Sequence, residues 1–340
     1  AAGLTQTINP QTPMNQTIQL PVDELKHALP GLSKVVSKSS HLPVLCSVRV
    51  ARSDSGRVTV QATDIDSLVT YHGQEPQTGP ACELLVPFEP FRNIVKACPA
   101  QERLHLVLDA KDRVTLRYFI GRTPVEKMVE VPFIDDWPKT QSITEPGAPV
   151  DADFKQALRE ALDCVGNDSS RLTTQGAFID VSQPKASYLV GTDGRHIYAA
   201  NSFTLDLRES VIVPCRKFLL WPAFAQDGDW TLAVQPGSPD GQWVKIASAR
   251  WTLVTKAIEG PYPKWRNVLP PGQDRTHIVL NEAAIAQMLE TAPRPPVSDE
   301  VDQPVGLEAR DGKFWLKSRA KGQSEWTSFE VSGATVEGKP

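Results

Sequence analysis

Apolar residues recur at helical spacing in separate segments of the chain. Two stripes are the clearest: Leu25, Leu29, Leu32 and Val36, and Phe154, Leu158, Leu162 and Val165. A recurrence of three to four residues places such side chains on one face of an α-helix. We expect each helix to pack that face on a sheet and to expose the other face to solvent.

Short segments of alternating apolar and polar residues follow the helices. In the first half they are "LHLVLDA" (104–110), "RVTLRYFIG" (113–121) and "PVEKMVEV" (124–131), and in the second "WTLAVQP" (230–236), "WVKIASA" (243–249) and "WTLVTKAIEG" (251–260). Alternation with period two predicts strands. Before each set, "LLVPFEPFRNIVKA" (84–97) and "VIVPCRKFLLWPA" (211–223) predict a strand, a proline and a helix. The pattern indicates an α+β fold whose unit is a strand, a helix and about three strands.

The unit repeats along the chain. "PVDELKHAL" (21–29) recurs as "PVDADFKQAL" (149–158), and Lys26 and Lys155 are 129 residues apart. The same offset carries Thr63-Asp64 onto Thr192-Asp193, and a weaker third copy starts at "HIVLNEAAIAQML" (277–289). We therefore predict domains over 17–144 and 145–272 and a third domain over 273–340 with room for one unit only, preceded by a polar, disordered tail over 1–16.

Composition restricts the class of protein. The chain has 340 residues, is 40% hydrophobic and 22% charged, and has a net charge of −4. It contains no apolar run of membrane-spanning length, and five widely spaced cysteines predict buried free thiols in a cytoplasmic protein. The net charge gives no overall attraction to nucleic acid, although a local basic face is compatible with it.

Basic residues gather on the predicted solvent faces of four helices. They are Lys26, Lys34 and Lys38 in or near the first, Arg92 and Lys96 in the second, Lys155 and Arg159 in the third, and Arg216 and Lys217 in the fourth. On one helix this would be an ordinary solvated face. Recurrence on four related helices of an acidic protein favours contact with phosphates.

The stretch "YLVGTDGRHIYAAN" (188–201) combines an acid, a base and an imidazole in one turn. Such a turn is compatible with catalysis, a phosphate loop or a metal loop. Its counterpart at 58–71 keeps Thr-Asp but has Ile65 and Asp66 instead of Gly194 and Arg195, and no imidazole. We expect Asp193 to cap the backbone N–H groups of the turn, and Gly194 to Ile197 to be the functional part.

Three segments carry a resemblance to a known family. "HLPVLCSVRV" with "VTVQATDIDSLVTY", the stretch "YLVGTDGRHIYAAN", and "LVTKAIEGPYPKWRNVLP" (253–270) resemble the bacterial DNA sliding clamp, the beta subunit of DNA polymerase III, over roughly residues 17 to 333. The resemblance implies antiparallel sheets outside, helices lining a central channel, and a homodimeric ring around duplex DNA. It implies a processivity factor without catalysis, cofactor or metal, whose partners are DNA polymerase, the clamp loader and other peptide-bearing proteins.

The resemblance also assigns two sets of residues. The DNA-binding set joins the basic helix positions with a loop arginine: Lys26, Lys34, Lys38, Arg92, Lys96, Lys155, Arg159, Arg171, Arg216 and Lys217. The partner-peptide pocket comprises Thr174, Thr192, Gly194, Arg195, His196, Ile197, Pro263 and Val268. Ser39 and the pair Leu172-Thr173 stand where the family often has DNA-contacting arginine and tyrosines, and Lys38 and Arg171 lie beside them.

Two other classes remain open. A clamp-like accessory or inhibitory protein would bind clamp partners without encircling DNA, and the short third domain favours it. A hydrolase or nuclease would need convergent acids, for which Asp64 and Asp66 are candidates. The six histidines show no HExxH spacing, and the chain has no CxxC, Walker loop or G-x-S-x-G elbow, so an enzyme is the least favoured class.

Overall fold

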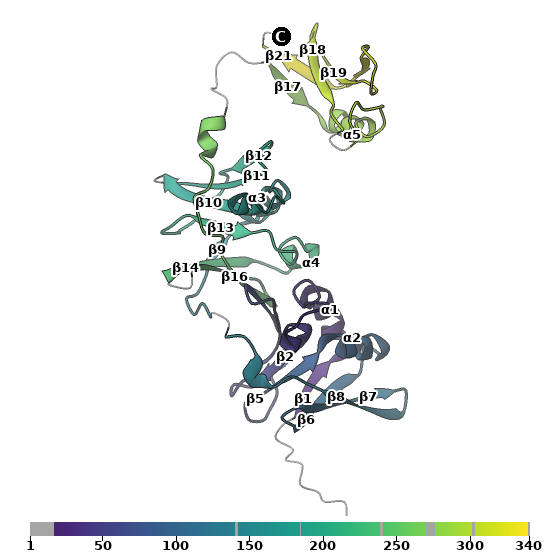
Figure 1. Cartoon of the computed structure of the whole chain (residues 1–340), viewed down its shortest axis with the longest axis vertical. Helices are drawn as coiled ribbons and strands as arrows, with labels where there is room; N and C mark the ends of the chain where they lie inside the picture. The colour runs from purple at the N-terminus through teal and green to yellow at the C-terminus, as the bar shows by residue number, and fades with distance from the viewer. Residues whose placement is uncertain are drawn as a thin grey trace, which may run out of the picture. The chain divides into compact units, whose positions relative to one another are not determined.

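In a computed structural model the chain divides into two compact units, Ala1–Trp265 and Arg266–Pro340 (Figure 1). The structure describes residues 17–139, 142–183, 185–238, 241–269, 276–300 and 303–338. The disordered tail predicted over 1–16 lies outside these residues. Among the described residues, no helix is long and apolar enough to cross a membrane.

The first half of the first unit follows the predicted order. Its strands and helices are β1 (Thr17–Pro21), α1 (Val22–Leu32), β2 (Ser47–Arg52), β3 (Val58–Thr63), β4 (Ser67–His72), β5 (Cys82–Pro87), α2 (Phe88–Ala97), β6 (Arg103–Ala110), β7 (Arg113–Ile120) and β8 (Thr123–Glu130). The short 3₁₀ turn η2 (Pro43–Cys46) lies between α1 and β2, and η3 (Ile134–Asp136) follows β8. The helix α1 ends where Pro30 and Gly31 weaken it, and its stripe from Leu25 to Val36 is buried as predicted.

The second half repeats this order with one change. It comprises β9 (Ala148–Val150), α3 (Ala152–Asp163), η4 (Leu172–Gln175), β10 (Gly176–Gln183), β11 (Ala186–Thr192), β12 (Ile197–Ala200), β13 (Val211–Pro214), α4 (Pro222–Ala225), β14 (Trp230–Ser238), β15 (Gly241–Ala247) and β16 (Trp251–Lys256). The 3₁₀ turn η5 (Trp265–Val268) begins at the last residue of the first unit and continues into the second. The helix predicted within 211–223 is wrong in extent, because hydrogen bonds from Leu219 N and Trp221 N close separate turns before α4. Arg216 and Lys217 therefore do not lie on a helix.

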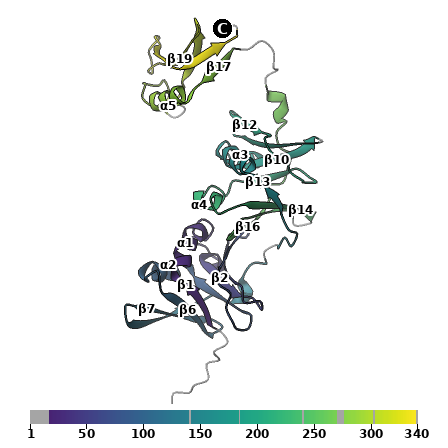
Figure 2. The same ribbon diagram turned by 180° about the vertical axis from the view of Figure 1, so that it is seen from behind.

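Three antiparallel sheets build the first unit. Their strand orders are β1-β6-β7-β8, β12-β11-β10-β13 and β5-β2-β3-β4-β16-β15-β14-β9. In the eight-stranded sheet, β4 pairs with β16 from Trp251 opposite Tyr71 to Thr255 opposite Ser67, so the two halves share one sheet (Figures 1 and 2). The hydroxyls of Ser67 and Thr255 meet at 3.2 Å across this junction. One continuous core of buried apolar side chains runs through both halves.

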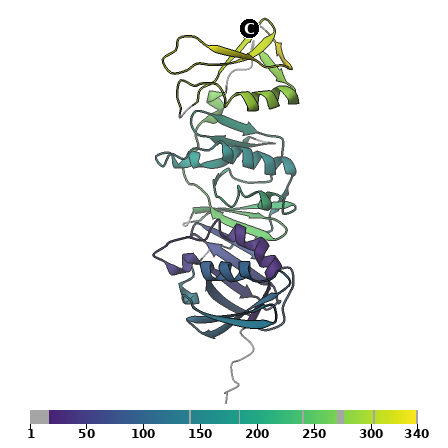
Figure 3. The ribbon, with the colours of Figure 1, turned by 90° about the vertical axis from the view of Figure 1, so that its right-hand side faces the viewer.

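The second unit contains one helix among its described residues. It consists of β17 (His277–Leu280), α5 (Glu282–Thr291), β18 (Gly306–Arg310), β19 (Lys313–Ser318), β20 (Thr327–Glu330) and β21 (Ala334–Glu337). The helix α5 lies against the strands of this unit (Figure 3). Its Ala284 and Met288 pack against Phe314 and Leu316 of β19. The domain boundaries at 144 and 272 remain predictions.

The cysteines only partly follow the expectation from the sequence. All five are free, as predicted. Cys98 is buried, whereas Cys46, Cys82, Cys164 and Cys215 are half-buried, so the prediction of five buried thiols is wrong for these four. Burial raises the pKa of the Cys98 and Cys215 thiols, which disfavours the reactive thiolate.

Candidate functional site

The two Thr-Asp turns are built alike. Thr192 Oγ1 donates to His196 O at 2.5 Å and accepts from Gly194 N at 3.0 Å. In the first half, Thr63 Oγ1 donates to Ser67 O at 2.8 Å and accepts from Ile65 N at 3.1 Å. Each threonine therefore closes its own turn, and the shared Thr-Asp pair is structural.

The aspartate of the second turn is held by more donors than that of the first. Asp193 Oδ1 accepts from Arg195 N at 2.8 Å and from His196 N at 2.7 Å, and Oδ2 lies 2.9 Å from His196 Nδ1. The backbone N–H of His196 is the main cause that holds the pKa of Asp193 well below its ordinary value. The predicted capping role of Asp193 is confirmed. The imidazole is tied to this carboxylate, and both belong to the frame of the turn.

Gly194 lets the second turn adopt a positive φ and leaves room for a neighbouring side chain. Its φ is +88°, and a Cβ at this position would lie 3.0 Å from Arg171 Nη1. Arg171 precedes η4, whose Thr174 carbonyl accepts from Gly166 N at 2.9 Å. The loop before β10 and the turn after β11 therefore meet at one end of the sheet β12-β11-β10-β13.

A loop after β16 packs beside the same sheet. The ring of Tyr262 stacks on Phe178, with ring centroids 4.6 Å apart, and its hydroxyl donates to Val190 O at 3.2 Å. Trp265 Nε1 donates to the buried Asp180 Oδ2 at 3.0 Å. These two anchors fix the segment that contains Pro263.

The predicted pocket residues differ in exposure. Gly194, Arg195, His196 and Pro263 are exposed and Ile197 is half-buried. Thr174 and Thr192 are buried, and both hydroxyls donate to backbone carbonyls, so neither is open to a ligand. Val268 lies beyond the division between the two units and is 68% exposed. The assignment of these eight residues to one peptide pocket remains a prediction.

Two of the predicted DNA-binding lysines have equivalent structural contacts. Lys26 Nζ donates to Cys98 O at the end of α2 at 2.7 Å, and Lys155 Nζ donates to Gly228 O just after α4 at 2.8 Å. Lys155 also lies 5.3 Å above the ring of Trp230. A cation at unpaired carbonyls of a helix end stabilises that end. These contacts bridge 72 and 73 residues, so local patterns in the sequence gave no sign of them.

The other basic candidates are placed differently. Lys34, Lys38, Lys96, Arg171 and Lys217 are exposed, whereas Arg92, Arg159 and Arg216 are half-buried. Arg92 pairs with Glu89, and Arg216 lies 3.7 Å from Asp64 Oδ2 and donates Nε to Thr255 Oγ1 at 3.4 Å. Arg216 therefore bridges the two halves beside the shared sheet. The exposed residues are the ones most available to phosphates.

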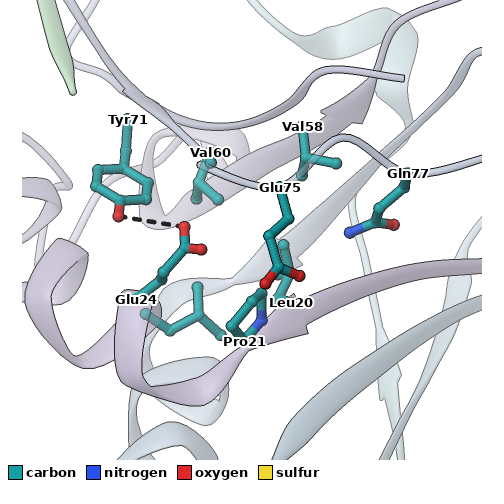
Figure 4. Close-up of a pocket in the computed structure, with 10 residues that line it drawn as sticks. Leu20, Pro21, Glu24, Val58, Val60, Tyr71, Glu75 and Gln77 are labelled. Atoms are coloured by element: carbon teal, nitrogen blue, oxygen red, sulfur yellow. Dashed lines mark hydrogen bonds between the residues drawn. The ribbon is translucent and has the colours of Figure 1, made fainter. Parts of the chain in front are cut away.

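A hollow between α1 and the strands β3 and β4 holds a carboxylate (Figure 4). Glu24 Oε2 accepts from Tyr71 Oη at 3.3 Å and from Gln74 N at 3.1 Å. Burial, followed by the charge of Glu24, raises the pKa of Tyr71 to about 12. Glu75 in the same hollow pairs with Arg103 at 2.5 Å. Both carboxylates therefore bind other groups of the fold.

The two acids considered for catalysis both lie in the turn of the first half and take part in its structure. Asp64 Oδ1 accepts from Ser67 N at 2.7 Å, and the carbonyl of Asp66 accepts from Lys256 N at 2.8 Å. Within the described ranges, no group of three or more histidine, cysteine, aspartate or glutamate residues could hold a metal ion.

Known proteins share both sequence and fold with the chain. No family model matches it. It is 23% identical to the beta sliding clamp of Salmonella typhimurium over 260 residues, which are 74% of this chain and 68% of that protein. It is 20% identical to the beta sliding clamp of Pseudomonas putida over 335 residues, 95% of this chain and 86% of that protein.

Solved structures of clamps have the same fold. The beta subunit of DNA polymerase from Streptococcus pyogenes matches with a TM-score of 0.78 and 19% identity, covering 95% of this chain and 85% of that one. A sliding clamp from Pseudomonas aeruginosa bound to griselimycin matches with a TM-score of 0.77 and 18% identity, over 95% of this chain and 85% of that one. In sequence along most of its length and in fold, the chain is therefore similar to bacterial DNA sliding clamps.

Proposed function

We propose that the chain is a processivity factor that encircles duplex DNA and tethers a replicative polymerase to it. The observation that carries this proposal is the repeated strand–helix–strand unit, which matches beta sliding clamps over 95% of the chain in sequence and in fold. A tether of this kind needs no reaction of its own. Asp64, Asp193 and His196 form bonds within the turns of the fold, which is compatible with a tethering role.

Contact with DNA would rest on exposed basic side chains. Lys34, Lys38, Lys96, Arg171 and Lys217 are free to meet phosphates, whereas Lys26 and Lys155 each already donate to a carbonyl. Phosphate contacts position a protein on DNA without reading its sequence, and their strength falls steeply as salt rises. Weak contacts of this kind allow sliding when a closed ring prevents escape.

Partner binding would use the end of the sheet where Gly194 to Ile197 and Pro263 lie. Ile197 supplies an apolar side chain, and Gly194 lets a peptide backbone approach closely. Arg171, Arg195 and His196 give this end a basic rim. We therefore infer that its ligands are short peptides with an apolar anchor and acidic flanks, borne by polymerase and clamp-loader subunits.

A homodimer would close the ring. In the sheet β1-β6-β7-β8 the strand β8 pairs on one side only, and its Met128 is 62% exposed. An unpaired edge strand is a ready surface for pairing with a second chain. Sedimentation velocity tests this proposal, because a mass near twice 37.3 kDa is expected and a persistent monomer would contradict it.

Primer extension on single-stranded circular DNA tests the function as a whole. With the replicative polymerase and clamp loader of the source organism, addition of the chain should lengthen the products made in one binding event about tenfold or more. Ile197→Asp places a charge in the apolar floor and should abolish the gain. Product lengths that do not change on addition of the chain would contradict the proposal. Peptide binding without longer products would instead favour an accessory protein.

A further inference from the structure

A second apolar groove lies in the first half of the first unit, away from the site described above. It runs between η2, the end of β8 and the segment that follows β8. Leu42 and Phe133 line it and are 51% and 52% exposed, an unusual exposure for large apolar side chains. Pro43, Pro132 and Pro138 add rigid apolar surface.

Packing beneath the groove holds its walls in place. Val44 and Leu45 of η2 form a small buried cluster with Leu85, and Ile134 and Trp137 pack against it. Hydrogen bonds from Asp136 N to Phe133 O at 3.1 Å and from Trp137 N to Ile134 O at 3.0 Å shape the second wall. A groove with fixed walls binds a ligand without first ordering itself.

The internal repeat relates this groove to the peptide site of the second half. Pro43–Cys46 lies 129 residues before Leu172–Gln175, and both segments form 3₁₀ turns ahead of a strand. Phe133 lies 129 residues before Tyr262. Tyr262 folds inward onto Phe178, but the residue at the position of Phe178 in the first half is Arg49, which pairs with Glu83. Phe133 lacks that aromatic partner and stays half in solvent.

The first-half groove and the peptide site proposed in the second half differ in charge. The carboxylates of Glu130 and Asp136 line the first-half groove, and no lysine or arginine is among its lining residues. Arg113 stands opposite Glu130 in the β7–β8 ladder, yet in the part of the chain that the structure describes neither Glu130 nor Asp136 forms an ion pair. Arg171 and Arg195 lie at the second-half site instead.

We propose that the first-half groove is a second docking site, for an extended segment of a partner protein that carries a large apolar anchor between lysines or arginines. The anchor packs on Leu42 and Phe133, and the flanking cations meet Glu130 and Asp136. The apolar contact supplies most of the affinity, and the charged rim selects against acidic peptides. This site goes beyond the proposed processivity function and does not depend on it.

Fluorescence anisotropy with the full chain tests the proposal. The probe is a fluorescein-labelled peptide with a central Leu-Phe pair and two lysines on each side, and its matched control has glutamates in place of the lysines. The lysine peptide should bind saturably and the glutamate peptide should bind at least about tenfold more weakly at this groove. Ile197→Asp removes the second-half site, so measurements in that background report on the first-half groove alone.

Two variants separate the contributions. In the Ile197→Asp background, Phe133→Ala should weaken binding of the lysine peptide about tenfold because the anchor loses its contact. Glu130→Gln with Asp136→Asn should weaken it about threefold to tenfold at low salt, with the difference shrinking as salt rises. Phe133, Glu130 and Asp136 are exposed, so a thermal midpoint equal to that of Ile197→Asp alone is the folding control.

Three results would overturn the proposal. They are the lack of saturable binding, an affinity that Phe133→Ala leaves unchanged, and equal affinity for the lysine and glutamate peptides. A lysine peptide attracted only by the net charge of −4 would give the second result. None of these results bears on primer extension, so failure here is distinguishable from failure of the processivity function.

Discussion

The two halves of the first unit share a frame and differ at a few positions where neighbours come close. Both keep the Thr-Asp turn and a lysine that caps the end of a following helix. They part at Ala62, where the second half has Gly191, and at Ile65, where it has Gly194. The repeat preserves the hydrogen bonds that close each turn. The substitutions change how closely a helix can pack on its strand and how accessible the turn is. Gene duplication followed by local change would produce such a pattern.

The largest expected effect comes from the helix that packs on β11. A Cβ on Gly191 would lie 1.9 Å from Ala161 O, in the backbone of α3. Gly191→Ala should therefore lower the free energy of unfolding by about 3 kcal/mol, because a close-packed helix must move. Ala62→Gly in the first half should cost only about 1 kcal/mol, from backbone entropy. Urea denaturation of both variants compares the halves directly. Equal losses in the free energy of unfolding would contradict the closer packing of the helix on its strand in the second half.

The turns should respond in opposite directions. Gly194 and Ile65 both have positive φ, +88° and +81°, which disfavours any residue with a Cβ. Gly194→Ala should destabilise the protein by about 1–2 kcal/mol, and Ile65→Gly should stabilise it by up to about 1 kcal/mol. Thermal unfolding measures both changes. A loss of stability in Ile65→Gly would show that the half-exposed Ile65 side chain contributes more packing than its backbone costs.

The capping lysines should behave alike in stability measurements. Lys26→Met and Lys155→Met each remove a charge-assisted bond to a carbonyl at a helix end, at a cost of about 1 kcal/mol. Lys34→Gln and Lys96→Gln, which change exposed lysines, should leave the thermal midpoint unchanged and weaken DNA binding at low salt. Titration of labelled duplex DNA supplies the second measurement. If Lys26→Met weakened DNA binding without destabilising the protein, the capping role would be wrong.

The smallest effect is a pH dependence of the second turn. Hydrogen bonds hold the pKa of Asp193 below its ordinary 3.8, so its ionised form stabilises the fold. This contribution is complete above pH 3.8 and is lost as the pH falls through the lower pKa of the folded state. Asp193→Asn should therefore reduce stability at neutral pH and reduce its decline in acid. Unfolding curves from pH 7 to about pH 2 compare the two proteins, and parallel curves would contradict the expectation.

Local patterns predicted the elements that depend on neighbouring residues. The stripes of α1 and α3 and the strands β6 to β8 follow from periodicity, and the Thr-Asp turn bonds within five residues. The short α4 was not predictable, since the same apolar residues pack as turns around Phe218. Long-range pairings were equally hidden, among them β4 with β16 and Lys26 with Cys98.

The candidate sites also depend on contacts between distant residues, which local patterns in the sequence do not show. The resemblance placed Gly194 to Ile197 at the peptide pocket, but sequence alone could not show that the hydroxyls of Thr174 and Thr192 are used inside the fold. It also gave no sign of the first-half groove, because Phe133 looks like a core residue until its partner position is seen to hold Arg49. Exposure of an apolar side chain depends on what the rest of the fold places opposite it.

Retention on circular DNA tests the central claim most directly. The chain, labelled and loaded by the clamp loader onto nicked plasmid, should co-elute with the circle through gel filtration at high salt, where phosphate contacts are screened. Cutting the plasmid once should release it, because a ring slides off an open end. Elution of the chain with the circle before the cut and separately after it is the predicted result. Failure to stay on the uncut circle, or retention on the linear DNA, would contradict topological tethering.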